Sequence, residues 1–238
     1  MNTKLIIALD LPDRDKVLRH VDMLKDYADV FKVGFELFTS AGPEIVKSII
    51  KKGCKVFLDL KYHDIPNTVA KSAEVATELG VFMFNLHSSG GSIMMRTTAE
   101  IVDNKARKLK IRKPIILAVT VLTSIDEKIL KRELGIKREV NNHVVKLAKL
   151  AKECGLDGVV ASSLEISSIR EACGKDFVIV TPGIRPVWAS KNDQKRINTP
   201  ANAVKLGADY IVVGRPILDS KNSVNAAKMV LNEMKRMF

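Results

Sequence analysis

Three ionisable side chains stand close together where the apolar segment "KVFLDLKYHDIPNT" (55–68) ends. Asp59, Lys61 and Asp64 follow or interrupt a run that otherwise reads as a buried strand, and a Pro-Asn-Thr break comes directly after them. Carboxylate and ammonium groups in a partly dry cavity shift one another's pKa values and can stabilise charge on a substrate. The spacing therefore predicts a catalytic cluster that works through fixed charges and proton transfer.

Two further ionisable residues lie near the ends of earlier apolar segments. Asp10 ends "LIIALD" and Lys32 lies within "VFKVGF". Alternate side chains of a strand point to the same face, so these two residues can share one cavity with Asp59 and Lys61 if the strands are neighbours. A salt-bridge cluster that only fills the cavity is the alternative, but it stabilises poorly compared with apolar packing. Asp64 follows its strand and can reach either this cavity or a neighbouring subunit.

A second group of residues follows two apolar segments near the end of the chain. "VTPGIRP" places Arg185, and "VVGRP" places Gly214 and Arg215, directly after these segments. Backbone N–H groups assisted by arginine are typical of phosphate sites in α/β barrels. The long polar segment 185–200 between them predicts a lid in which Gln194 suits a phosphate, with an ordinary surface loop as the alternative.

The elements that must position these residues are eight short apolar runs separated by amphipathic helical segments. The runs span residues 5–10, 30–35, 55–60, 81–86, 114–119, 158–162, 177–182 and 210–214. Such runs are typical of parallel strands covered on both faces. An open doubly wound sheet and a closed barrel both fit βα repeats. The count of eight, and an acid where a dinucleotide-binding turn needs glycine, favour a single-domain (β/α)8 TIM barrel over residues 1–238.

Composition restricts the class of protein. The net charge is +12, but aromatic residues make up only 5% of the chain, so no stacking platform accompanies the lysines and we expect no nucleic-acid partner. The apolar runs are too short to span a bilayer, and the N-terminus is too short for a signal-peptide core. We therefore expect a cytoplasmic protein with no membrane partner.

Cysteines and histidines give no sign of a metal centre. Cys54, Cys154 and Cys173 are far apart and form no CxxC motif, so reduced, mostly buried thiols are expected. His63 and His87 each lack a ligand at metal-binding spacing. We expect hydrogen-bonded structural roles for both histidines and no bound metal.

Several motifs together carry a resemblance to a known family. The string "FLDLKYHDIPNT" (57–68) resembles the signature of the orotidine 5′-phosphate decarboxylase family. Further similar motifs follow the family's order over almost the whole chain: "ALD" (8–10), "FKVGFELF" (31–38), "VTVLTS" (119–124), "TPGIRP" with "DQKR" (181–196) and "GADYIVVGRPI" (207–217).

The resemblance implies decarboxylation of orotidine 5′-monophosphate to uridine 5′-monophosphate and CO2 in pyrimidine biosynthesis, without metal or organic cofactor. Lys61 would protonate C6 of the pyrimidine and stabilise the carbanion there. Asp59 would lie against the substrate carboxylate. Lys32 and Asp10 would complete the charge network and hold ribose hydroxyls.

The resemblance also implies a homodimer with shared active sites. Asp64, as part of the catalytic set, and Thr68 would come from the second subunit, and Thr123 would face the pyrimidine ring. The residues implied in phosphate binding and lid closure are Arg185, Gln194, Gly214 and Arg215.

Two alternatives differ in testable ways. A Mg²⁺-dependent phosphosugar decarboxylase or aldolase of the same suprafamily shares the D-x-K-x-x-D core, but it carries an acid where this chain has Lys32, whose charge repels a cation. A chelator distinguishes the two, since our interpretation predicts full activity in its presence. A non-catalytic RNA-binding barrel leaves the charge cluster without a purpose, and a salt-independent affinity for RNA would exclude it.

Overall fold

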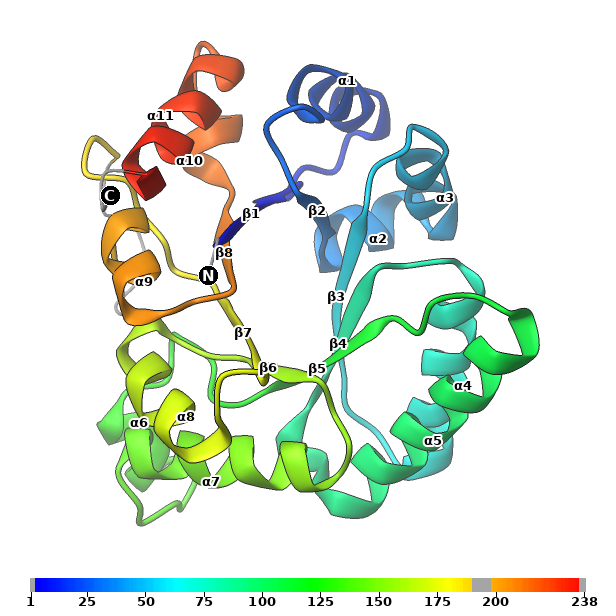
Figure 1. Cartoon of the computed structure of the whole chain (residues 1–238), viewed down its shortest axis with the longest axis vertical. Coiled ribbons are helices and arrows are strands. Elements are labelled where there is room, and N and C mark those ends of the chain that lie inside the picture. Colours follow the sequence, from blue (N-terminus) through cyan, green and yellow to red (C-terminus); the bar gives the residue numbers. More distant parts are fainter. Residues whose placement is uncertain (1–2, 190–197, 236–238) are drawn as a thin grey trace.

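The computed structural model describes residues 3–189 and 198–235, and within them eight parallel strands form one closed barrel (Figure 1). Each strand pairs with the next along the chain, and β8 pairs with β1 to close the circle. The strands are β1 (Lys4–Ala8), β2 (Val30–Val33), β3 (Val56–Tyr62), β4 (Met83–His87), β5 (Ile115–Val119), β6 (Gly158–Val160), β7 (Val178–Thr181) and β8 (Tyr210–Val213). Every predicted strand is present, with ends within two residues of those expected.

Helices form a ring around the barrel (Figure 1). They are α1 (Arg14–Leu24), α2 (Phe35–Ala41), α3 (Pro43–Lys51), α4 (Pro66–Glu78), α5 (Gly91–Leu109), α6 (Glu127–Arg132), α7 (Val140–Glu153), α8 (Ile166–Cys173), α9 (Pro200–Leu206), α10 (Arg215–Leu218) and α11 (Ser223–Lys235), with 3-10 turns η1 (Ser88–Gly90) and η2 (Ser163–Glu165). Among residues 3–189 and 198–235, no helix combines the length and the apolar character needed to cross a bilayer.

The alternation of side chains along each strand separates two buried layers. On β3, Val56 and Leu58 pack in the large layer between barrel and helices, whereas Phe57 packs inside the barrel with Ile6 and Val30. The period of two accounts for Asp59, which shares the inward face of β3 with Phe57 and lines the cavity. The side chains that point into the barrel are apolar along most of each strand. The charged side chains that point inward lie beyond this apolar layer, at the carboxyl ends of the strands.

Local sequence sets where the helices after these strands begin. Asp13 caps α1 by accepting a hydrogen bond from the backbone N–H of Lys16, 2.9 Å away. Pro66 starts α4 immediately after β3, at a position where a missing N–H is tolerated. Gly80, at φ 77°, follows the end of α4 and turns the chain toward β4.

Candidate active site

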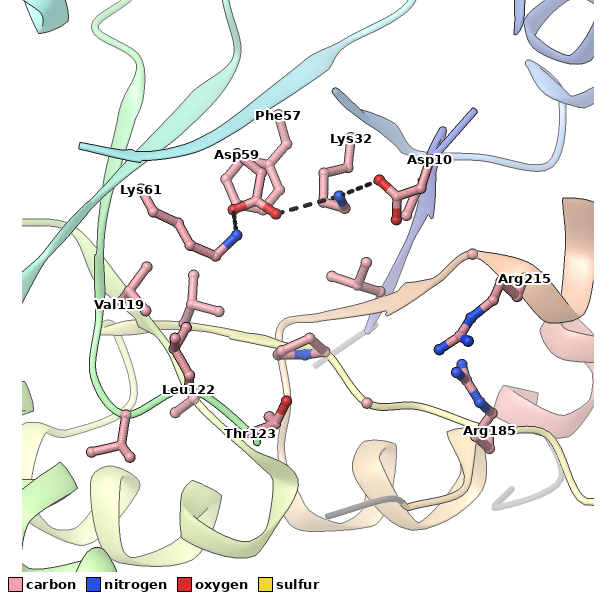
Figure 2. A pocket seen from close by; sticks show the side chains of 18 residues that line it. Asp10, Lys32, Phe57, Asp59, Lys61, Val119, Leu122, Thr123, Arg185 and Arg215 are labelled. Carbon is pink, nitrogen blue, oxygen red and sulfur yellow. Dashed lines mark hydrogen bonds and ion pairs between the residues drawn. The ribbon is translucent and has the colours of Figure 1, made fainter. Parts of the chain in front are cut away.

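A cavity of about 260 Å³ opens at the carboxyl ends of the strands. Charged side chains lie on one side of it, two arginines lie opposite, and apolar side chains cover the wall between (Figure 2). Its lining residues are Ala8, Asp10, Lys32, Phe57, Asp59, Lys61, Val119, Val121, Leu122, Thr123, Val160, Ala161, Pro182, Gly183, Arg185, Val212, Gly214 and Arg215.

Four charged side chains form a continuous ion chain along one wall of the cavity (Figure 2). Lys32 Nζ lies 2.9 Å from Asp10 Oδ1 and 3.3 Å from Asp59 Oδ2. Lys61 Nζ lies 2.7 Å from the other oxygen of Asp59. The predicted grouping of these four residues in one barrel mouth is confirmed. The ion chain runs from Asp10 through Lys32 and Asp59 to Lys61, so Lys61 is its last member.

The register of the strands explains why Lys32 lies at the centre of this ion chain. Lys32 is paired with Ala8 of β1 and with Phe57 of β3, two residues before Asp10 and Asp59 respectively. Burial lowers the pKa of Lys32, but attraction to Asp59 and Asp10 outweighs burial, so the pKa lies above the usual value for lysine. Lys32 therefore stays charged and holds both carboxylates in place.

Glycine at position 34 makes room for the same pair. A Cβ atom on Gly34 would lie 2.8 Å from Lys32 Nζ and 3.1 Å from Asp10 Oδ1. Both distances are shorter than ordinary van der Waals contact. Any larger side chain at position 34 must push the Lys32 ammonium away from its partners.

Lys61 adopts a backbone conformation that sequence reasoning did not anticipate. Its φ is 43°, and apart from glycines only Lys110 shares a positive φ within the described ranges. The ladder between β3 and β4 is irregular here, since β3 advances four residues from Leu58 to Tyr62 while β4 advances two, from Phe84 to Leu86. A β-bulge of this kind re-aims a side chain next to a functional site. The bulge, rather than a regular period of two, directs Lys61 into the cavity.

Asn85 and Phe35 also contact Lys61, and neither was predicted. The Asn85 side chain lies opposite the bulge and accepts a hydrogen bond from the Lys61 backbone N–H at 2.8 Å. Phe35 places its ring centroid 5.4 Å from Lys61 Nζ, a favourable position for a cation beside an aromatic face. The only hint of Asn85 in the sequence is that it is a single amide side chain within the apolar run "VFMFNL".

The opposite side of the cavity carries the predicted anion-binding residues. Arg185 follows β7, Arg215 follows β8, and their guanidinium groups point toward one another on the same side of the cavity (Figure 2). Gly214 brings its backbone close to β1, since a Cβ atom there would lie 3.2 Å from the Ala8 Cβ. Gln194 falls outside the described residues. The two arginines and the glycine backbone can hold an anion at the side of the cavity away from Lys61 (Figure 2).

Apolar side chains and one hydroxyl form the wall between the two charged sides. Leu122 and Thr123 follow β5, and Val160 and Pro182 extend this wall from β6 and β7. Figure 2 shows Leu122 and Thr123 below the ion chain. A flat ring can pack against this wall, with the Thr123 hydroxyl available for its polar edge.

Asp64 and Thr68 lie apart from the cavity of their own chain. Both are exposed, and Asp64 accepts a hydrogen bond from the backbone N–H of Ile65 at 2.6 Å. Thr68 lies in the first turn of α4, on the rim beside β3. The structure thus brings eight predicted residues to one cavity, whereas these two are exposed and do not line it.

His63 and His87 stack on each other beside the ion chain, with ring centroids 5.3 Å apart. Burial, together with the nearby His63 ring and the Lys61 charge, lowers the pKa of His87 to about 4. His87 is therefore neutral at neutral pH. Within the part of the chain that the structure describes, no group of three or more His, Cys, Asp or Glu residues is arranged to hold a metal ion.

Comparisons with known proteins agree with this geometry. The family model described as "Orotidine 5'-phosphate decarboxylase / HUMPS family" matches residues 3–230. Orotidine 5'-phosphate decarboxylase of Syntrophomonas wolfei is 52% identical over 232 residues, which cover 97% of each chain. The protein of that name from Moorella thermoacetica is 51% identical over 97% of this chain and 92% of its own.

A solved structure shows the same architecture. The crystal structure of orotidine 5'-phosphate decarboxylase from Lactobacillus acidophilus superposes with a TM-score of 0.86 at 37% identity, covering 98% of this chain and 99% of its own. The fold, the arrangement of the cavity and the match over residues 3–230 lead to one conclusion. This chain belongs to the orotidine 5′-phosphate decarboxylase / HUMPS family.

Proposed function

We propose that this chain decarboxylates orotidine 5′-monophosphate to uridine 5′-monophosphate and CO2, the activity for which its relatives are named. One observation carries the proposal: the alternating ion chain that ends at Lys61 faces two arginines in the same cavity. Such a cavity matches a substrate with a phosphate at one end and a carboxylate-bearing ring at the other.

The lining residues define how the substrate binds. The phosphate lies between Arg185 and Arg215, where bidentate hydrogen bonds to the guanidinium groups are available. The ribose hydroxyls reach Asp10 and Lys32, and the pyrimidine ring packs near Thr123. This orientation brings C6 of the ring to the Lys61 ammonium.

The reaction then needs charge stabilisation and one proton. The bond between C6 and the carboxylate carbon breaks, CO2 leaves, and the electron pair stays on C6. The Lys61 ammonium lies beside that carbon, stabilises the carbanion and transfers a proton to it. Lys61 is neutral after this step and recovers its proton from solvent. A fixed cation suits this step because the ring delocalises the new charge poorly.

Asp59 has two functions in this scheme. Its two oxygens hold Lys61 at 2.7 Å and Lys32 at 3.3 Å, so the catalytic ammonium is oriented before substrate arrives. Its charge also lies close to the substrate carboxylate, which leaves as neutral CO2. Repulsion between the two anions is relieved as the bond breaks, and this relief favours the forward reaction.

The alternative of Mg²⁺-dependent phosphosugar chemistry has weaker support. The family description covers a second group, so family membership alone does not choose between the activities. The relatives at 51–52% identity carry the decarboxylase name. In addition, Lys32 places a buried positive charge between the carboxylates of Asp10 and Asp59. That charge repels a divalent cation.

The test is loss of orotidylate absorbance with purified Lys61→Ala protein. We expect turnover to fall at least about 100-fold, as is typical when a general acid is removed. Lys71→Ala is the matched control, because Lys71 is an exposed lysine on α4 paired only with Glu74 among the described residues. Near-parent turnover by Lys61→Ala, with the fold verified by circular dichroism, would refute the proposal.

We infer further that two copies of the chain share their active sites. Phe35, Ile65 and Ile93 are 56%, 68% and 71% exposed, and they follow β2, β3 and β4 on one side of the cavity mouth. Large exposed apolar side chains gathered on one rim are typical of a protein interface. A second copy on this rim covers them and carries its own Asp64 and Thr68 toward the cavity.

Subunit exchange tests this arrangement. Lys61→Ala and Asp64→Ala proteins are each expected to be nearly inactive alone, since each lacks one part of every site. A mixed dimer contains one complete site, so activity reappears after exchange. Persistent inactivity after exchange has been demonstrated, for instance by mass spectrometry of tagged subunits, contradicts a contribution of Asp64 from the partner. A monomer in sedimentation at assay concentration contradicts the dimer itself.

The chain is expected to work as a single domain in the cytoplasm. All three cysteines, Cys54, Cys154 and Cys173, are free thiols, as is usual in reducing compartments. Fractionation of the native host locates the activity, and recovery with a secreted fraction would contradict this placement.

A further inference from the structure

A buried amide on the neighbouring strand connects the two residues at the centre of the proposed chemistry. Asn85 of β4 is fully buried at 0% exposure and is not among the residues that line the cavity. Its Oδ1 accepts the backbone N–H of Lys61 at 2.8 Å, and its Nδ2 donates to Asp59 Oδ1 at 2.7 Å. The same Asp59 oxygen accepts from Lys61 Nζ. The amide therefore completes a closed ring of contacts with both ends of Lys61.

The orientation of this amide is fixed by its partners. A backbone N–H only donates, and an ionised carboxylate only accepts. The oxygen of Asn85 must therefore face Lys61, and the NH2 group must face Asp59. If the amide were reversed, its NH2 group would face the Lys61 N–H, a second donor, and its oxygen would face the Asp59 carboxylate, a second acceptor. Asn85 is thus suited to hold the ionised form of Asp59 in one pose.

The left-handed conformation of Lys61 needs such a partner. A lysine at φ 43° has a strained backbone and persists only where its surroundings enforce it. The regular ladder cannot do so, because the β3–β4 pairing skips from Leu58 to Tyr62. In this gap the Asn85 side chain replaces the missing ladder acceptor for the Lys61 N–H.

We propose that Asn85 is a positioning residue, which acts through Lys61 and Asp59 to hold the acid–base pair in its reactive geometry. This inference rests on the proposed function for its kinetic readout but not for its structural one. Asn85 does not line the cavity, so its loss leaves the proposed contacts to phosphate, ribose and ring in place. Loss of the amide therefore lowers kcat and leaves KM nearly unchanged.

The first test is Asn85→Ala. We expect kcat to fall about 100-fold, the effect typical of a misplacement of about 1 Å at a reacting group, while KM changes by less than about threefold. Thr98→Val is the matched control, since Thr98 is also 0% exposed and loses one buried hydrogen bond, to Met94 O on α5. A kcat for Asn85→Ala within threefold of that of the control overturns the inference.

The second test, Asn85→Asp, separates a specific role from a structural one. The new carboxyl keeps an acceptor for the Lys61 N–H, and only its protonated form can donate to Asp59. Burial and the Asp59 charge raise the pKa of such a carboxyl. The activity of Asn85→Asp is therefore highest at low pH and falls as pH rises through the pKa of the new carboxyl. The pH profiles of the parent and of Asn85→Ala lack this fall.

The groups that face position 85 support this assignment. Asp59 and Lys61 face it from β3, with Lys32 behind Asp59. His87, two residues along β4, has a pKa of about 4 and stays neutral through most of the range. On β5 the paired residue is the apolar Leu117. A pH profile of Asn85→Asp identical to that of the parent overturns the inference. This test remains decisive even if the Asn85→Ala protein does not fold.

A structural readout keeps this inference separate from the proposed function. If the parent protein does not consume orotidylate, the proposed function fails, and the crystal structure of Asn85→Ala decides the positioning role. Departure of Lys61 from positive φ, with its Nζ withdrawn from Asp59, supports the role. Retention of φ near 43° with the Lys61–Asp59 contact intact overturns it.

Discussion

Replacement of Gly34 by alanine is expected to lower activity by displacing the Lys32 ammonium. The new Cβ would lie 2.8 Å from Lys32 Nζ, whereas carbon and nitrogen need about 3.5 Å. The ammonium must therefore move by about 0.7 Å, the difference between these two distances. Its bonds to Asp10 and Asp59, at 2.9 and 3.3 Å, cannot both survive that shift.

The backbone at Gly34 gives no reason for a large loss of stability. Its φ of −100° is open to alanine. Alanine is a weaker N-cap than glycine for α2, but it also restricts the unfolded chain, which stabilises by about 0.4–1 kcal/mol. The two effects nearly cancel. Any fall in Tm therefore comes from the displaced Lys32 ammonium, and we expect it to be smaller than in Lys32→Met, which removes the cation altogether.

The assay compares kcat/KM on orotidylate with the thermal midpoint of the same samples. We expect kcat/KM of Gly34→Ala to fall by about 10- to 100-fold, because the ion chain loses its central contact. Gly158→Ala is the contrasting variant, since its Cβ would meet the Val178 backbone oxygen at 2.2 Å and cannot be relieved by a side-chain movement. That variant should lose stability. Parent-like kcat/KM in Gly34→Ala would refute the reasoning.

Three further predictions use other parts of the site. Lys32→Met leaves Asp10 and Asp59 without the cation between them, and we expect the free energy of unfolding in urea to fall by about 3–5 kcal/mol; a change below about 1 kcal/mol would argue against a buried ion chain. Arg215→Ala should lower kcat/KM by about 10- to 100-fold, the loss of a charged hydrogen bond, and weaken competitive inhibition by inorganic phosphate; unchanged inhibition would contradict a phosphate site. The pKa of His87 is lowered from 6.5 to about 4, so the unfolded chain takes up a proton first and stability falls as pH drops from about 6.5 to about 4; His87→Gln should reduce this fall, and an equally steep loss in the variant would rule His87 out as its source.

The strands and the ion chain could be predicted because both depend on short-range pattern. Apolar runs rich in Val, Ile and Leu identified every strand, and the count of eight indicated closure. In a closed barrel, residues at the carboxyl ends of strands necessarily converge. Asp10, Lys32 and Asp59 therefore meet for reasons visible in the sequence.

The conformation of Lys61 could not be predicted in the same way. A β-bulge depends on how β3 pairs with β4, and no local residue pattern in "LDLKYH" specifies it. Asn85 and Gly34 owe their importance to the same tertiary contacts. Asp64 and Thr68 are a different case, because both are exposed and neither lines the chain's own cavity. The roles proposed for them need a second copy of the chain.

The central claim is that fixed protein charges, without a metal ion, drive the loss of CO2. Orotidylate turnover by protein dialysed against EDTA, with EDTA present in the assay, tests it most directly. We expect the same rate with and without the chelator, and the same rate again after Mg²⁺ is added in excess. Loss of turnover in EDTA with recovery on adding Mg²⁺ would contradict it.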